Sequence, residues 1–335
     1  MHVRLMKYLI PVFILVMAGC SPEPAAYTRL EGNAQGTTFH MTYRDSLSRD
    51  FSGPVDSLFR LIDRSMSLWD STSVISRLNR NEPGVPIDEH FTAVFRRSEE
   101  VSAATEGAFD ITVGPLVKAW GFSTKKGLPP PDSATVDSLL QLVGYEKVRL
   151  ENGVLIKADP RMQVDVNAIA QGYTVDVMAR FFQQHGIRDY MIEIGGEVIT
   201  AGRNEEGEAW KIGIDKPLDN EAEGRPLQTV VRLSGKALAT SGSYRKFVVR
   251  NGKKYSHEID PHTGYPITHN MLSVSVLADD CTTADAYATA FMVVGLEKAL
   301  EIARAQRLEF YAVCAGENGT FQVKTTPGFP AHEAD

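Results

Sequence analysis

Helical and strand patterns follow one another in this chain without the regular alternation of a βαβ fold. Strand patterns dominate from residue 210 to 275, and residues 147–157 have the pattern of a hairpin turning at Asn152-Gly153. Amphipathic helices are predicted over residues 55–66, 91–105, 133–143, 168–185, 284–294 and 297–305. No internal repeat and no long linker rich in Ser, Gly or Pro divides the chain. We therefore expect a single compact α+β domain, in which mixed, largely antiparallel sheets pack against helices.

The first nineteen residues have the order of a bacterial export signal. A positively charged start is followed by an apolar run over residues 8–17, which is too short for a stable transmembrane helix. Ala18 and Gly19 then precede Cys20, as small residues do at the cleavage site of a lipoprotein. A buried N-terminal helix is the alternative, but Pro11 and the Ser-Pro-Glu-Pro sequence after Cys20 disfavour it.

This order predicts three segments. We expect a lipoprotein signal peptide over residues 1–19, a lipid anchor and tether over residues 20–29, and a folded domain over residues 30–330. Cys20 is the expected site of lipidation, and its acyl chains would anchor the protein firmly because each buried CH₂ contributes about 0.8 kcal/mol. The protein would then be held on a bacterial membrane in the cell envelope, facing the periplasm or the exterior.

Composition excludes several classes of protein. After residue 20 no apolar run reaches the length of about 18 residues that spans a bilayer, which excludes a polytopic membrane protein. The formal net charge is −7 and the acidic residues are spread along the chain, so nucleic acid is not an expected partner. Three cysteines without a CxxC pair exclude a disulfide framework and a thiol-exchange motif. A folded globular protein remains.

The common catalytic and nucleotide motifs are absent from the sequence. No GxGxxG follows a predicted strand, and neither a GxxxxGK[ST] loop nor a GxSxG elbow occurs. His257 and Glu258 begin like the zinc motif HExxH, but Pro261 stands where the second histidine is required. A dinucleotide fold, a phosphate loop, a nucleophile elbow and this zinc site are therefore not predicted.

One pair of oxygen-bearing side chains is spaced as a metal site requires. Asp285 and Thr289 lie four residues apart in a predicted helix, so that both oxygens face the same way. A carboxylate and a hydroxyl suit a hard cation such as Mg²⁺, which binds oxygen ligands. The alternative is that Thr282 and Asp285 form a helix-capping box, which would give Asp285 a purely structural role. Spacing alone favours the capping box.

Two further side chains are candidates for chemistry. His257 could act as a general base, because the ordinary pKa of histidine, about 6.5, suits proton transfer near neutral pH. The alternative is a hydrogen-bonded histidine beside a turn. Ser241, within Thr240-Ser241-Gly242-Ser243, could be a nucleophile, but the residues around it favour a serine in a turn.

Several sequence blocks occur together in one order, and their combination resembles the ApbE family of FAD:protein FMN transferases over about residues 35–313. The blocks are Gln35-Gly36-Thr37, Ser67-Leu68-Trp69, Leu78-Asn79, GAFDITVGPL at 107–116, WGF at 120–122, DVNAIAQGY at 165–173, EIGG at 193–196, TSGSYR at 240–245, SHEIDP at 256–261 and ADAYAT at 284–289. The lipoprotein signal agrees with this resemblance independently.

The resemblance implies a role for individual residues. Asp285 and Thr289 would bind Mg²⁺ together with the backbone carbonyl of Ala168. His257 would be the base, with Ser241 and Asp260 as helpers or phosphate contacts. The flavin and its diphosphate would lie against Gln35, Trp69, Ala108, Phe109, Asp110, Asp165, Gln171 and Ile259. For Trp69 and Phe109, burial in the apolar core is the alternative.

Three positions depart from the family pattern. Gln35 stands where the family often has Met, and Gln171 stands where it often has Lys or Glu. Both departures bear on FAD contacts rather than on the metal. Ala288 stands where some members carry a second acid, so one metal ligand of those members is missing here.

The activity that the resemblance implies is Mg²⁺-dependent transfer of FMN from FAD to a threonine or serine hydroxyl of an acceptor protein, with release of AMP. The acceptors would be redox proteins or subunits of membrane redox complexes. Two alternatives remain at this point. One is hydrolysis of FAD to FMN and AMP, and the other is a lipoprotein that binds flavin without catalysis.

Overall fold

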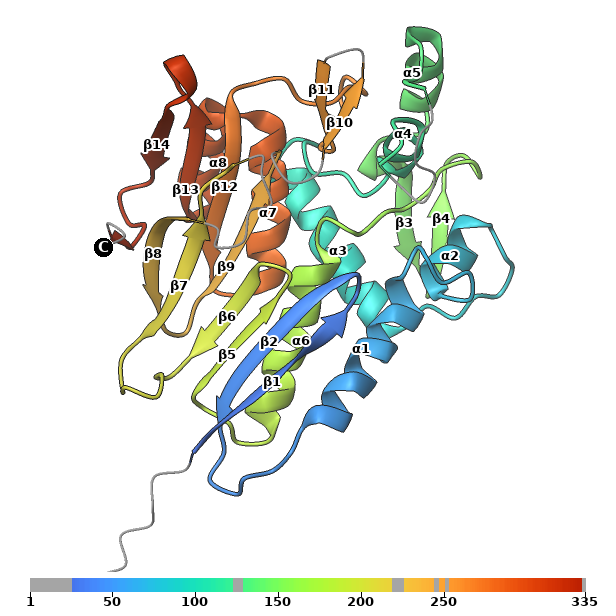
Figure 1. Cartoon of the computed structure of the whole chain (residues 1–335). Coiled ribbons are helices and arrows are strands. Elements are labelled where there is room, and N and C mark those ends of the chain that lie inside the picture. The colour runs from blue at the N-terminus through green and yellow to red at the C-terminus, as the bar shows by residue number, and fades with distance from the viewer. Residues whose placement is uncertain (1–25, 123–128, 219–225, 244–246, 251–252, 333–335) are drawn as a thin grey trace, which may run out of the picture.

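The computed structural model describes residues 26–122, 129–218, 226–243, 247–250 and 253–332 of the 335-residue chain. Within these residues eight strands form a central sheet, in which each neighbouring pair is antiparallel (Figure 1). In spatial order they are β1 (Tyr27–Ala34), β2 (Thr37–Arg44), β5 (Tyr190–Ile194), β6 (Glu197–Ala201), β9 (Ala237–Gly242), β12 (Met271–Ala278), β13 (Glu309–Ala315) and β14 (Phe321–Thr325). The expected α+β class with largely antiparallel sheets is confirmed.

Smaller sheets lie around the central one. They are the hairpin of β3 (Val148–Glu151) and β4 (Val154–Lys157), the hairpin of β10 (Phe247–Arg250) and β11 (Lys253–Ser256), and a sheet of β7 (Trp210–Asp215), β8 (Leu227–Leu233) and β15 (Ala331–His332). The sheet that contains β7 packs on one face of the central sheet, where Ile212 shares an apolar cluster with Val198 of β6 and Leu238 of β9.

Helices cover the opposite face of the central sheet. Neighbouring residues of a strand point to opposite faces, and Ile199 of β6 accordingly belongs to a cluster with Val175 and Phe182 of α6. Phe291 of α7 packs with Val274 of β12 in the largest core. The helices are α1 (Ser52–Met66), α2 (Val74–Asn79), α3 (Glu89–Ala104), α4 (Gly114–Ala119), α5 (Ser133–Leu140), α6 (Ala170–Gln184), α7 (Cys281–Val294) and α8 (Leu296–Gln306), with short 3-10 turns η1 (Tyr145–Lys147) and η2 (Glu317–Gly319).

The first described strand begins before the predicted start of the folded domain. The expected tether over residues 20–29 is wrong in its last three residues, because β1 starts at Tyr27 and pairs with β2 from that residue on. The Tyr27 ring lies edge-on to Trp210, with 6.0 Å between centroids, and its hydroxyl donates to the Arg203 carbonyl at 2.7 Å. These contacts hold the first residue of β1 against β7 and the loop that precedes it.

The predicted signal peptide over residues 1–19 and the lipidation site Cys20 lie outside the described residues. In the part of the chain that the structure does describe, no helix combines the length and the apolar character needed to cross a bilayer.

Candidate functional site

The centre of the site is the contact between helices α6 and α7. The backbone N–H of Gly172 in α6 donates to Asp285 Oδ2 in α7 at 2.9 Å, and Asp285 is 6% exposed. A Cβ atom on Gly172 would lie 2.4 Å from the Cys281 carbonyl oxygen and 2.7 Å from the Asp285 Cβ. Glycine therefore allows the two helices to approach closely enough for the backbone of one to orient the carboxylate of the other.

The start of α7 overturns the capping-box interpretation of Asp285. The N-cap is Asp280, whose carboxylate accepts from the Thr283 backbone N–H at 2.8 Å. Thr282 does not cap the helix, because its hydroxyl donates to Asp176 of α6 at 2.5 Å. Asp285 thus lies beyond the capped turn, and its carboxylate faces α6. Asp176, the acceptor of the Thr282 hydroxyl, is itself buried, and burial raises its pKa.

Thr289 lies one turn further along α7 and contacts β9. Its Oγ1 lies 3.3 Å from Ser241 Oγ, and Ser241 pairs with Val274 across the β9–β12 ladder. The prediction of a turn at Ser241 is wrong, because the residue is in a central strand. Ala168 is half-buried and precedes α6 by two residues. The structure therefore brings Asp285, Thr289 and Ser241 together, with Ala168 close to the start of the neighbouring helix.

Gln171 at the start of α6 is held by the turn between β5 and β6. Its side-chain amide donates to the Ile194 carbonyl at 2.7 Å and also contacts the Glu197 carboxylate. Gly195 in this turn has φ +62°, and a Cβ there would overlap both the Gln171 amide and the Thr37 side chain. The start of α6 is thus packed against the turns of two hairpins, β5–β6 and β1–β2.

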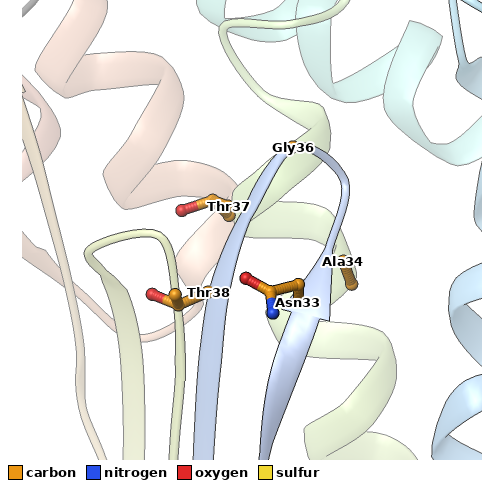
Figure 2. Close-up of a pocket in the computed structure, with 5 residues that line it drawn as sticks. All are labelled: Asn33, Ala34, Gly36, Thr37 and Thr38. Carbon is orange, nitrogen blue, oxygen red and sulfur yellow. The ribbon is translucent and has the colours of Figure 1, made fainter.

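Gln35 forms the β1–β2 turn and borders an open pocket. Its side-chain amide donates to Asp63 Oδ1 of α1 at 3.2 Å, and burial raises the pKa of Asp63. The neighbouring pocket, shown in Figure 2, has a volume of about 530 Å³, which is within the range of small-molecule sites. It is lined by Asn33, Ala34, Gly36, Thr37 and Thr38.

The two aromatic candidates have opposite environments. Trp69 is 68% exposed, so its interpretation as a core residue is wrong. Phe109 is 1% exposed and packs in the largest apolar cluster, as the core interpretation requires, and Ala108 beside it is 2% exposed. The side chains of residues 108 and 109 therefore belong to the core and are not exposed to a ligand.

Asp110 and Asp165 each organise a loop. Asp110 accepts from the Thr112 backbone N–H and hydroxyl at 2.7 and 2.6 Å and from the Tyr145 backbone N–H at 2.8 Å. The backbone N–H of Asp165 donates to the Ile111 carbonyl at 2.7 Å, so the two loops lie side by side. Burial raises the pKa of both carboxyl groups.

The loop after β11 packs on the segment around α4. Ile259 is 5% exposed and shares an apolar cluster with Trp120, whose indole N–H donates to the Gly264 carbonyl at 2.9 Å. Asp260 accepts from the His262 backbone N–H at 2.9 Å and from the Thr263 hydroxyl at 3.0 Å. Asp260 therefore closes the turn of its own loop, and the Ile259 side chain belongs to the core.

His257 precedes this turn and is partly accessible. Its side chain is 32% exposed, and its Nδ1 lies 3.3 Å from Glu258 Oε2. The ring of Phe122 lies edge-on to the imidazole, with 6.4 Å between centroids. A histidine so placed is supported on one side by protein and can be reached from outside, as proton exchange with a large substrate requires.

Sequence reasoning missed Gly172, Glu258 and Asp63. The only signal for Gly172 was its position in the second turn of a predicted helix. Glycine is unfavourable at such a position unless close packing requires it. Within the described residues no three His, Cys, Asp or Glu side chains are grouped as metal ligands. The proposed ligand set differs from such a group, because only one of its three members is a carboxylate: Asp285, Thr289 and the Ala168 carbonyl.

Comparison with known proteins identifies the family. The model of the ApbE family matches residues 35–313. An FAD:protein FMN transferase of Haemophilus influenzae is 36% identical, with 97% of this chain and 98% of that protein covered. Among solved structures, the flavin transferase ApbE from Vibrio cholerae has a TM-score of 0.80 at 34% identity, covering 91% of this chain and 99% of that one. For the apo form of the flavinyl transferase ApbE from Pseudomonas stutzeri, the TM-score is 0.81 at 30% identity, with 90% and 95% covered. The chain belongs to the ApbE family.

Proposed function

We propose that this protein transfers FMN from FAD to a threonine or serine hydroxyl of an acceptor protein, with Mg²⁺ as cofactor and AMP as the released product. The curated relatives named above support the transfer. The observation that carries the assignment to this site is the buried Asp285 carboxylate, which shares a face of α7 with Thr289 and is oriented by the Gly172 N–H.

The donor atoms around Asp285 fit a hard cation. Asp285 and Thr289 offer a carboxylate and a hydroxyl one helical turn apart, and the Ala168 carbonyl is a third oxygen donor near the start of α6. Mg²⁺ prefers such oxygen ligands and usually retains waters or substrate phosphates beside them. When bound there, the ion would supply charge neutralisation at the diphosphate.

The transfer replaces the phosphoanhydride bond of FAD by a phosphoester bond to the acceptor. The acceptor oxygen forms a bond to the FMN phosphorus, and the bond from that phosphorus to the bridging oxygen breaks, so that AMP leaves with the electron pair. The proton of the acceptor hydroxyl goes to His257. Since His257 is 32% exposed, a side chain of a second protein can approach it. The role we propose for Ser241, whose Oγ lies 3.3 Å from Thr289 Oγ1, is a contact to a phosphate oxygen.

A labelling experiment tests this function. The protein is incubated with FAD, Mg²⁺ and an acceptor fragment that carries a target threonine, and the products are separated on a denaturing gel. Covalently bound flavin fluorescence on the acceptor supports the proposal. FMN and AMP without labelled acceptor would indicate an FAD pyrophosphatase, and unchanged FAD would indicate a flavin-binding protein without catalysis.

Replacing His257 by Ala is expected to lower the transfer rate by about 100-fold or more, since a positioned acid or base contributes about 10² to 10⁴. FAD binding is expected to be unchanged. His262→Ala is the matched control, because His262 lies in the same loop but its ring nitrogens face Asp260 and the Glu106 carbonyl. An unchanged transfer rate in the His257 variant would mean that another group takes the proton.

Replacing Trp69 by Ala is expected to weaken FAD binding about fivefold, because stacking of an aromatic ring contributes about 1 kcal/mol. The melting temperature should not change, since the side chain is 68% exposed. The measurement is a fluorescence titration with FAD. Leu47→Ala, which removes another exposed apolar side chain at a position outside the family sequence blocks, is the control. Equal affinity in both variants would remove Trp69 from the flavin site.

The cellular location also belongs to the proposal. Residues 1–20 have the order of a lipoprotein signal, and we infer that Cys20 anchors the protein to a membrane of the cell envelope. A tethered transferase would meet acceptor redox proteins at a raised local concentration.

A further inference from the structure

Glu258 is a carboxylate buried beside the candidate base. Its side chain is only 4% exposed, although it follows the partly accessible His257 directly in the chain. Oε2 accepts a hydrogen bond from the Ser256 hydroxyl, and His257 Nδ1 lies 3.3 Å from the same oxygen. The other carboxylate oxygen, Oε1, is buried and has no hydrogen-bond partner among the described residues.

Burial of this group requires compensation. A carboxylate removed from water is unfavourable unless polar groups face it. Here the Ser256 hydroxyl donates a hydrogen bond to Glu258, and the imidazole of His257 lies within ion-pair distance of it. The backbone N–H of Glu258 in turn donates to Ser256 Oγ at 3.2 Å, which fixes the geometry of these three residues.

The charge of Glu258 favours one tautomer of His257. Glu258 Oε2 lies 3.3 Å from Nδ1, and an ionised carboxylate is stabilised by a hydrogen on the nearer ring nitrogen, so the tautomer with the hydrogen on Nδ1 is favoured. In the neutral ring the hydrogen is then absent from Nε2, and that nitrogen can take a proton. A base oriented by a third group in this way is the arrangement that activates hydroxyl nucleophiles in unrelated hydrolases.

We propose that Glu258 is a positioning residue for flavin transfer: it holds His257 in the tautomer and orientation in which Nε2 accepts the proton of the acceptor hydroxyl. This inference rests on the proposed function, in which His257 is the base. The competing explanation is that Glu258 only fastens the end of β11 through Ser256, in which case its loss changes stability and leaves transfer unaltered.

A double-mutant cycle separates the two explanations. The transfer rate at saturating FAD, the KM for FAD and the melting temperature are measured for the full chain and for Glu258→Gln, His257→Ala and the double variant. We expect Glu258→Gln to lower the transfer rate at least about tenfold with an unchanged KM, because an amide can present its N–H to Nδ1 and favour the wrong tautomer. In the His257→Ala background the same change should have no further effect.

Ser256→Ala is the matched control for structure. It removes the hydroxyl that donates to Glu258 while retaining the contact with His257, so it should lower the melting temperature more than the transfer rate. A normal transfer rate in Glu258→Gln, or an equal loss in both backgrounds, would overturn the inference alone. Normal transfer in His257→Ala would overturn the choice of base and this inference with it.

Discussion

Asp285→Ala is expected to reduce Mg²⁺-dependent flavin transfer by at least about 100-fold, because the carboxylate is the one charged donor in the proposed ligand set. The Gly172 N–H would also lose its acceptor, so a smaller loss of stability should accompany the loss of activity. The measurement is the transfer rate as a function of Mg²⁺ concentration, with the melting temperature determined in parallel.

Two further variants separate the charge from the hydrogen bond. Asp285→Asn retains an oxygen that can accept from Gly172 but carries no charge, so it should fold normally and require more Mg²⁺. Asp280→Ala removes the N-cap carboxylate of the same helix and should cost about 1 kcal/mol of stability without changing the Mg²⁺ dependence. Full activity of Asp285→Ala at the wild-type Mg²⁺ concentration would remove Asp285 from the metal site.

Gly172→Ala is expected to destabilise the protein and to impair transfer, although alanine is the better helix former by about 1 kcal/mol. The added methyl carbon would lie 2.4 Å from the Cys281 carbonyl oxygen, which belongs to the backbone and cannot rotate away. Helices α6 and α7 must therefore move apart, at a typical cost of about 1–3 kcal/mol for overpacking, and Asp285 moves with α7.

The chain provides a control for this substitution. Gly53 lies in the first turn of α1, and a Cβ atom built there meets no atom within 4 Å outside its chain neighbours and the nearby backbone of its own helix. Gly53→Ala should therefore leave the melting temperature unchanged or raise it. Thermal unfolding and the Mg²⁺ dependence of transfer are measured for both variants. If Gly172→Ala raised the melting temperature as Gly53→Ala does, the close helix contact would not constrain the site.

Local patterns predicted those parts of the structure that local interactions determine. The hairpin of β3 and β4 follows from its Asn-Gly turn, and the facing of Asp285 and Thr289 follows from helical spacing. Strand β9, by contrast, has the sequence Ala-Leu-Ala-Thr-Ser-Gly, which carries no strong strand signal. It is a strand because β6 and β12 pair with it, and for this reason Ser241 was misplaced in a turn.

The contacts that shape the site are between residues distant in the chain. Gly172 and Asp285 are 113 positions apart, so no sequence window contains both. Trp69 and Phe109 belong to the same residue class, yet one is 68% exposed and the other 1%. Their difference depends on which elements cover each ring, and that arrangement arises only when the whole sheet has assembled.

Strand β1 lies between the N-terminal segment of the chain and the proposed active site. It begins at Tyr27 and ends at the β1–β2 turn, and Thr37 after this turn lies beside Gly195 and the Gln171 side chain at the start of α6 (Figure 1). Eight extended residues span about 25 Å. A solid support or a bulky reporter coupled ahead of Tyr27 would therefore leave the proposed FAD site accessible. The immobilised protein should still transfer flavin to a soluble acceptor.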